Sequence, residues 1–206
     1  MKERRVFLLG GSLARPSHTS ALLRVAEHTV RTHGAEADRW DLAERALPIA
    51  DPAQHALPLG ERHPRGRELV AAARSADALV LASPLYHSSY SGVVKNALDH
   101  LNARDLRGKP VALLSHSGRR PSAQAIDGLR LVVRALLGIS VPSQVITVEA
   151  DWEHDARGLR LVGAAARERL GESVLELLWF AERLGGEARS PNGAAWTSTL
   201  AEARGG

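Results

Sequence analysis

Hydroxyl-bearing residues cluster between the first apolar run of the chain and the first segment with helical periodicity. Ser12 follows a Gly-Gly pair, and Ser17, Thr19 and Ser20 come shortly after it. The first N–H groups of a helix lack intrahelical acceptors and carry the positive end of the helix dipole. Hydroxyls at such a helix start predict a phosphate-binding loop, to which Arg15 adds a charge-assisted hydrogen bond. An ordinary helix N-cap is the alternative, but it needs one hydroxyl and no arginine.

The same loop lacks the signatures of two common nucleotide sites. It contains neither the Gly-x-x-x-x-Gly-Lys-Ser/Thr pattern of a P-loop nor the spaced glycines of a Rossmann fingerprint. We therefore expect neither a nucleoside triphosphate nor a Rossmann-bound dinucleotide at this position.

A polar segment with two tyrosines, residues 83–92, follows another apolar run. It contains Pro84, Leu85, Tyr86 and His87. Hydroxyls, N–H groups and flat rings in one loop suit an aromatic ligand that also forms hydrogen bonds. The alternative is that Tyr86 and Tyr90 pack in the core with satisfied hydroxyls.

A third polar loop follows the apolar run at residues 109–115. The N–H groups near Ser117 and Gly118 are expected to hold the carbonyl edge of a ring. Arg119 and Arg120 either place positive charge at the mouth of the site or form a solvated turn.

Histidine is the remaining side chain in these loops with chemistry to offer. The nine histidines show no metal-ligand spacing and the chain has no cysteine, so a metal site is not expected. His18, His87 and His116 lie in the three loops, and we expect them to line the site. No Gly-x-Ser-x-Gly motif occurs, and no Ser-His-Asp chain can be inferred.

The elements that must position these loops alternate along the chain. Apolar runs predict strands at residues 5–10, 35–41, 78–82, 109–115 and 143–148. Helical periodicity predicts helices at residues 19–31, 65–75, 91–102, 123–137 and 159–184, with an irregular connection at 42–64. This α/β alternation is typical of a doubly wound, five-stranded parallel sheet with helices on both faces, in the flavodoxin-like order 2-1-3-4-5. The loops after strands 1, 3 and 4 then lie side by side.

Composition narrows the class of protein. The 206 residues suit one domain, which we place at residues 1–185, with 186–206 as a flexible C-terminal tail. A net charge of +4 with 4% aromatic residues does not favour nucleic-acid binding. No apolar run reaches the ~20 residues of a membrane span. The lack of cysteine and of a signal peptide leads us to expect a cytoplasmic protein.

Two segments resemble the flavodoxin-like NAD(P)H-dependent FMN reductase family. Ser83-Pro84-Leu85-Tyr86 followed by residues 90–99 (YSGVVKNALD) is similar to the Pro-x-Tyr … Ser-Gly-x-Leu-Lys-Asn/Thr-x-x-Asp block of that family. Gly11-Ser12 and residues 16–20 are similar to its phosphate loop. The match is closest to the FMN reductases of two-component alkanesulfonate monooxygenase systems, and it covers residues 5–184.

The resemblance implies hydride transfer from NADPH (or NADH) to FMN and onward to a second acceptor. We expect the protein to supply reduced flavin to a flavin-dependent monooxygenase. The alternatives are a quinone or azo-dye reductase with tightly bound FMN, or a non-enzymatic flavodoxin-like electron carrier. Family members are generally dimers or dimers of dimers, so a homodimer or homotetramer is expected. The implied cofactor-binding residues are Ser12, Arg15, Ser17, Thr19, Ser20, Pro84, Leu85, Tyr86, His87, Ser117, Gly118 and Arg119.

Two positions depart from the family pattern. Ala14 stands where the family often has an arginine, although Arg15 is next to it. Gly128 stands where some sulfonate-system reductases carry an extra aromatic residue that distorts the helix near the flavin. The second departure favours retention of FMN over its release.

Overall fold

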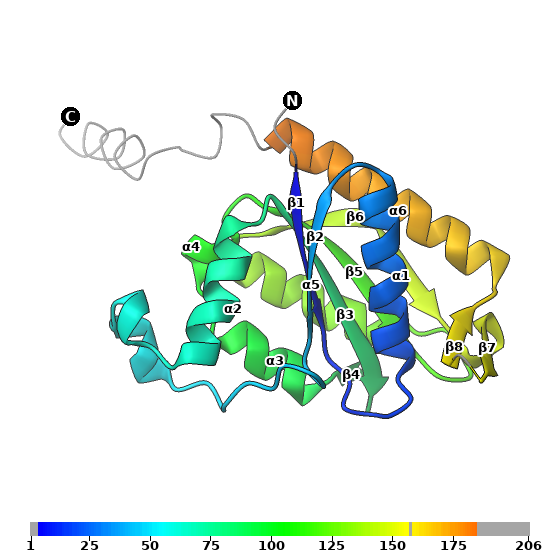
Figure 1. The fold of residues 1–206 in the computed structure, drawn as a ribbon, viewed down its shortest axis with the longest axis horizontal. Coiled ribbons are helices and arrows are strands. Elements are labelled where there is room, and N and C mark those ends of the chain that lie inside the picture. Colours follow the sequence, from blue (N-terminus) through cyan, green and yellow to red (C-terminus); the bar gives the residue numbers. More distant parts are fainter. Residues whose placement is uncertain (1–3, 157, 185–206) are drawn as a thin grey trace, which may run out of the picture.

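The computed structural model describes residues 4–156 and 158–184 (Figure 1). The strands are β1 (Arg5–Gly10), β2 (Glu36–Asp41), β3 (Ala78–Tyr86), β4 (Ser89–Tyr90), β5 (Pro110–His116), β6 (Ile139–Thr147), β7 (Trp152–Asp155) and β8 (Gly158–Leu161). The α-helices are α1 (His18–Thr32), α2 (Pro64–Ser75), α3 (Gly92–Asp99), α4 (Ala103–Leu106), α5 (Gln124–Ala135) and α6 (Ala164–Leu184). Three 3-10 turns are η1 (Pro52–Ala56), η2 (Leu59–Glu61) and η3 (Glu149–Asp151). The expected tail at 186–206 lies outside the described residues.

The main sheet has the order β2-β1-β3-β5-β6, and these strands pair in parallel. This confirms the predicted doubly wound order, because β5 and β6 are the fourth and fifth strands of that prediction. The order reverses between β1 and β3, and in such sheets ligands bind at the carboxyl ends of the strands on either side of that reversal.

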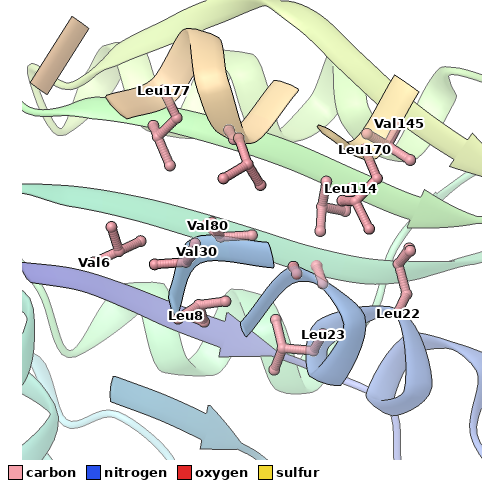
Figure 2. Packing of buried hydrophobic residues seen from close by; sticks show 14 of the residues in the cluster. Val6, Leu8, Leu22, Leu23, Val30, Val80, Leu114, Val145, Leu170 and Leu177 are labelled. Atoms are coloured by element: carbon pink, nitrogen blue, oxygen red, sulfur yellow. The ribbon is translucent and has the colours of Figure 1, made fainter. Parts of the chain in front are cut away.

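Two hydrophobic layers hold the sheet between helices. Val6 and Leu8 of β1 pack toward α1 and α6, whereas Phe7 and Leu9 pack toward α2, α3 and α5. Figure 2 shows the first layer, in which Leu22 of α1 and side chains of α6 meet the sheet. All five side chains are fully buried. Burial of each contributes about 1.5–3 kcal/mol, and the inner strand β1 is therefore apolar on both faces.

The segment after the third strand is more ordered than the sequence indicated. Residues 83–86 continue β3, and β4 turns back to pair with it, Leu85 opposite Tyr90. The turn residues His87 and Ser88 have φ of 49° and 64°. A two-residue hairpin turn with two positive φ angles usually carries Asn or Gly. Because neither residue type is present, the turn residues do not predict this hairpin.

The structure of the region before the last helix also differs from the prediction. We predicted a helix from residue 159, but residues 158–161 form β8, which pairs with β7, and α6 begins at Ala164. Leu159 and Leu161 lie two apart on a strand, and Leu161 is buried in the layer that α1 covers. A spacing of two residues is that of a strand, but a strand of four residues directly before a helix is too short to be separated from it by pattern, which explains the wrong prediction. Strand β6 likewise begins at Ile139, earlier than predicted.

The packing of Gly11 against α3 gives a test of this arrangement. A Cβ added at Gly11 would lie 1.9 Å from Cγ2 of Val94, whereas one at Gly92 would meet nothing within 4 Å. Gly11→Ala should therefore lower the free energy of unfolding by about 1–3 kcal/mol through overpacking. Gly92→Ala should leave it unchanged or raise it slightly. Urea titration followed by circular dichroism measures both, and equal midpoints for the two variants would contradict the packing.

Candidate functional site

A cleft of about 250 Å³ opens at the carboxyl edge of the sheet, between the loops that follow β1, β3 and β5. Its lining residues are Ser12, Ala14, Pro16, Ser17, His18, Thr19, Pro84, Leu85, Tyr86, His116, Ser117 and Gly118. The three loops predicted from the sequence to form one site therefore do meet. Figure 1 shows these strand ends together near the start of α1.

The start of α1 forms one end of the cleft. Ser17 is the N-cap, and its Oγ accepts the N–H of Ser20 at 3.1 Å. The N–H groups of His18 and Thr19 have no acceptor among residues 4–156 and 158–184. Together with the Ser17 and Thr19 hydroxyls, these N–H groups form an end of the cleft that suits an anion. The residues that line the cleft include no lysine or arginine.

Tyr86 forms the wall opposite this helix start. Its hydroxyl lies 3.5 Å from Oγ of Ser12, which also accepts the N–H of Ala14 at 3.3 Å. Tyr86 is 47% exposed, so its ring is open to a flat ligand in a way that a core tyrosine would not be. The structure thus does not support the alternative in which Tyr86 is core packing.

The loop after β5 offers one N–H group where two were expected. The N–H of Ser117 donates to the carbonyl oxygen of Thr147 at 3.0 Å, and the Ser117 hydroxyl donates to Arg120 O at 2.8 Å. Gly118 has φ of +74°, and in the described part of the chain its N–H has no acceptor. Of the two N–H groups expected to hold a ring, only that of Gly118 is therefore available, because the Ser117 N–H is paired with β6.

Four of the expected cofactor-binding residues lie outside this cleft. The Arg15 guanidinium donates to Ala43 O at 3.0 Å, and it lines a neighbouring cleft of about 200 Å³ together with Ser20. His87 is exposed at the tip of the β3–β4 turn. Arg119 is 90% exposed in its side chain and pairs with Glu149 at 3.7 Å. The contact with Ala43 places the Arg15 side chain beside the residues that follow β2.

Two histidines that we expected only to line the site form a stacked pair of rings in it. The rings of His18 and His116 stack with centroids 4.1 Å apart and planes 8° apart. The indole of Trp152 lies beside both rings, 5.4 Å and 6.4 Å away. Burial, and then the neighbouring His18 ring, lowers the pKa of His116 to about 4. Burial also lowers the pKa of His18. No spacing in the sequence signals this stack, because its members come from three separate elements.

The cleft fits the phosphate and ring of FMN. Unpaired N–H groups and hydroxyls at a helix start are the donors that a phosphate monoester requires. The Gly118 N–H and the open Tyr86 ring supply a donor and a flat surface for a polar ring system. The cleft contains no arrangement of nucleophile and base for hydrolysis, which agrees with a role in binding and orienting a cofactor that carries the chemistry.

Other classes of site have no support in the described residues. In residues 4–156 and 158–184, no group of three or more His, Cys, Asp or Glu is placed to hold a metal ion. Of the helices in this part of the chain, none is both long and apolar enough to cross a membrane.

A doubly wound sheet with this cleft defines a flavin-binding oxidoreductase, and comparison with known proteins supports that class. Residues 4–153 match the family described as NADPH-dependent FMN reductase. An FMN-dependent NADPH-azoreductase of Staphylococcus aureus is 42% identical over 148 residues, which is 72% of this chain and 79% of the relative. The protein belongs to the NADPH-dependent FMN reductase family and is an oxidoreductase that uses FMN and NADPH.

Solved structures share the fold at low sequence identity. An oxidoreductase from Corynebacterium diphtheriae superimposes with a TM-score of 0.70 at 20% identity, covering 89% of this chain and 99% of that one. An NADH:FMN oxidoreductase in its apo form gives 0.65 at 24% identity, with 93% and 92% covered. RosB with a bound flavin intermediate gives 0.73 at 15% identity, with 98% and 88% covered. These likenesses establish the flavodoxin-like fold.

Replacement of the hydroxyls at the start of α1 tests the anion-binding end. Ser17→Ala with Thr19→Ala should weaken FMN binding by about 1–3 kcal/mol, the scale of a few lost charge-assisted hydrogen bonds. Riboflavin has no phosphate and should bind the variant and the parent alike. Fluorescence titration measures both ligands.

Ser20 provides the matched control, because its side chain faces the neighbouring cleft. Ser20→Ala should leave FMN affinity unchanged. The assignment fails if the double variant binds FMN as tightly as the parent does.

Proposed function

We propose that this protein keeps FMN bound as a cofactor and uses NADPH to reduce a diffusible aromatic acceptor of the azo or quinone class. The observation that carries the proposal is the packing of α5 on the β3–β4 hairpin. Helix α5 runs without interruption through Gly128, and a Cβ added there would lie 2.9 Å from Cε1 of Tyr90. A side chain at residue 128 would therefore collide with the Tyr90 ring, so the helix is packed here for a glycine rather than for the aromatic residue that some sulfonate-system reductases carry near the flavin.

The similarity to curated relatives supports the same acceptor class. The S. aureus relative with 42% identity is named an azoreductase. Supply of reduced flavin to a monooxygenase, which the sequence led us to expect first, remains the second candidate. A non-enzymatic carrier is the least favoured, because the family to which the chain belongs consists of NADPH-dependent reductases.

Each wall of the cleft has a separate role in this proposal. Ser17, Thr19 and the α1 N-terminus hold the phosphate, while Gly118 donates to the polar edge of the ring and Tyr86 flanks it. When bound, FMN accepts hydride from NADPH and passes it on. The protein residues then only bind and orient, because the cofactor carries the chemistry and no acid or base side chain is required of them.

We further propose a homodimer or homotetramer that assembles near the mouth of the cleft. Leu13 and Ile49 are 59% and 85% exposed. Ile49 lies beside α3, because its neighbours Pro48 and Ala50 both form hydrogen bonds with Asn96. Burial of these apolar side chains against a second copy would supply part of the association free energy.

Retention of the cofactor separates the first two candidates. We expect the purified protein to be yellow and to keep FMN through gel filtration. It should oxidise NADPH with menadione or an azo dye when no free flavin is added. Steady-state absorbance assays measure this. If activity instead requires free FMN and saturates with it as a substrate, the protein supplies reduced flavin and the first proposal is wrong.

The arginine pair after β5 gives a test of nicotinamide recognition. The Arg119 side chain is exposed enough to leave Glu149 and grip the 2′-phosphate of NADPH. We expect NADPH to be preferred over NADH by roughly tenfold or more, an advantage of at least ~1.4 kcal/mol. Replacing Arg119 and Arg120 with Ala should remove this preference and leave FMN binding intact.

Salt and a distant arginine pair control this test. Raised ionic strength should weaken NADPH more than NADH, because an exposed charge contact is screened. Arg104→Ala with Arg107→Ala, before the amino end of β5, should keep the preference. An unchanged ratio of kcat/KM values in the Arg119/Arg120 variant contradicts the role of that pair.

A further inference from the structure

The stacked histidines stand between the two ends of the cleft. His18 is the first residue of α1, beside the phosphate-binding hydroxyls, and His116 is the last residue of β5, directly before Ser117 and Gly118. Nδ1 of His116 lies 3.2 Å from Oγ1 of Thr147, which fixes that ring against β6. The pair is therefore a fixed part of the wall rather than a mobile surface contact.

Charged and titratable groups reach this pair from two neighbouring elements. Glu149 of η3 raises the pKa of His18, and Asp151 of the same turn raises that of His116. His154 of β7 acts in the opposite direction on His18. Burial outweighs these carboxylates, and each ring also opposes a proton on the other at 4.1 Å. Without an anion in the cleft, both rings are neutral near pH 7.

A phosphate monoester would change this balance. The cleft wall holds no lysine or arginine, and Arg15 is bound to Ala43 O on the far side of the loop. The stacked rings are thus the side chains of the cleft that can become cations. A dianion near His18 favours its charged form, whereas two protons on rings 4.1 Å apart repel each other. The two rings therefore titrate as one unit that takes up a single proton.

We propose that the His18–His116 pair takes up one proton from solvent when the phosphate of FMN binds, and so acts as the cationic partner of that phosphate. The proposal rests on the FMN site proposed above. The imidazolium formed on one ring is stabilised by the phosphate, and the adjacent Trp152 indole packs beside both rings. The direction follows from linkage: a ligand that binds with proton uptake binds more tightly as the pH falls.

The pH dependence of FMN affinity tests the proposal. Between pH 8.5 and 6.5 the phosphate is largely a dianion, since its second ionisation lies near pH 6. Over this range the Kd for FMN should fall by roughly three- to tenfold, with uptake of about half a proton or more at pH 6.5. Fluorescence titration gives the first quantity. Calorimetry in buffers of different ionisation enthalpy gives the second. Riboflavin should show neither effect.

Variants that cannot titrate locate the proton. His18→Asn and His116→Asn should each remove most of the proton uptake and flatten the pH dependence. His28→Asn, at an exposed position of the same helix, should keep both. Unchanged riboflavin affinity and an unchanged thermal transition show that the variants are folded.

The outcomes separate this proposal from the site on which it rests. FMN and riboflavin binding equally to the parent protein would overturn the phosphate site itself. FMN binding more tightly than riboflavin, but with no proton uptake, would overturn the role of the histidines and leave the site intact. Proton uptake that persists in both Asn variants would also overturn it, because the proton would then reside elsewhere.

Discussion

A buried hydrogen bond fastens the phosphate loop to the rest of the cleft. The Ser91 hydroxyl donates to the carbonyl oxygen of Gly11 at 2.7 Å, and the N–H of Ser91 donates to Oγ of Ser83 at 2.9 Å. Ser91 is also the N-cap of α3, so one residue ties the loop after β1 to the β3–β4 hairpin and to a helix. Loss of such a buried bond leaves an unsatisfied acceptor, which costs about 1–3 kcal/mol. The distance between the α1 N-terminus and Tyr86 depends on this link.

The cleft proposed to bind a phosphate has few permanent charges on its wall. Its donors are N–H groups, hydroxyls and two neutral imidazoles. Arg15 instead contacts the carbonyl oxygen of Ala43, and Arg119 pairs with Glu149. A preformed dipole at a helix start costs no side-chain entropy when the ligand arrives. Only the histidine pair can adjust its charge, which is why its environment matters for binding and not only for packing.

Much of the scaffold could be predicted from the sequence because it depends on local patterns. Apolar runs that are buried on both faces identified the inner strands β1, β3 and β5, and the Ser17 cap marked the start of α1. The predictions fail where the local signal is weak or absent. The turn at His87–Ser88 adopts positive φ without Gly or Asn, and β8 is too short a run to be separated from α6 by pattern.

The sequence by itself determined the family, the cofactor and the three loops that meet at the cleft, since these follow from motifs and from the order of strands. Only the tertiary structure decided which groups in those loops remain available. Pairing with β6 occupies the Ser117 amide, and the loop before α1 directs Arg15 toward Ala43. Packing against Trp152 brings His18 and His116 together as a stacked pair. These outcomes depend on contacts between residues far apart in the chain, whose geometry no local spacing encodes.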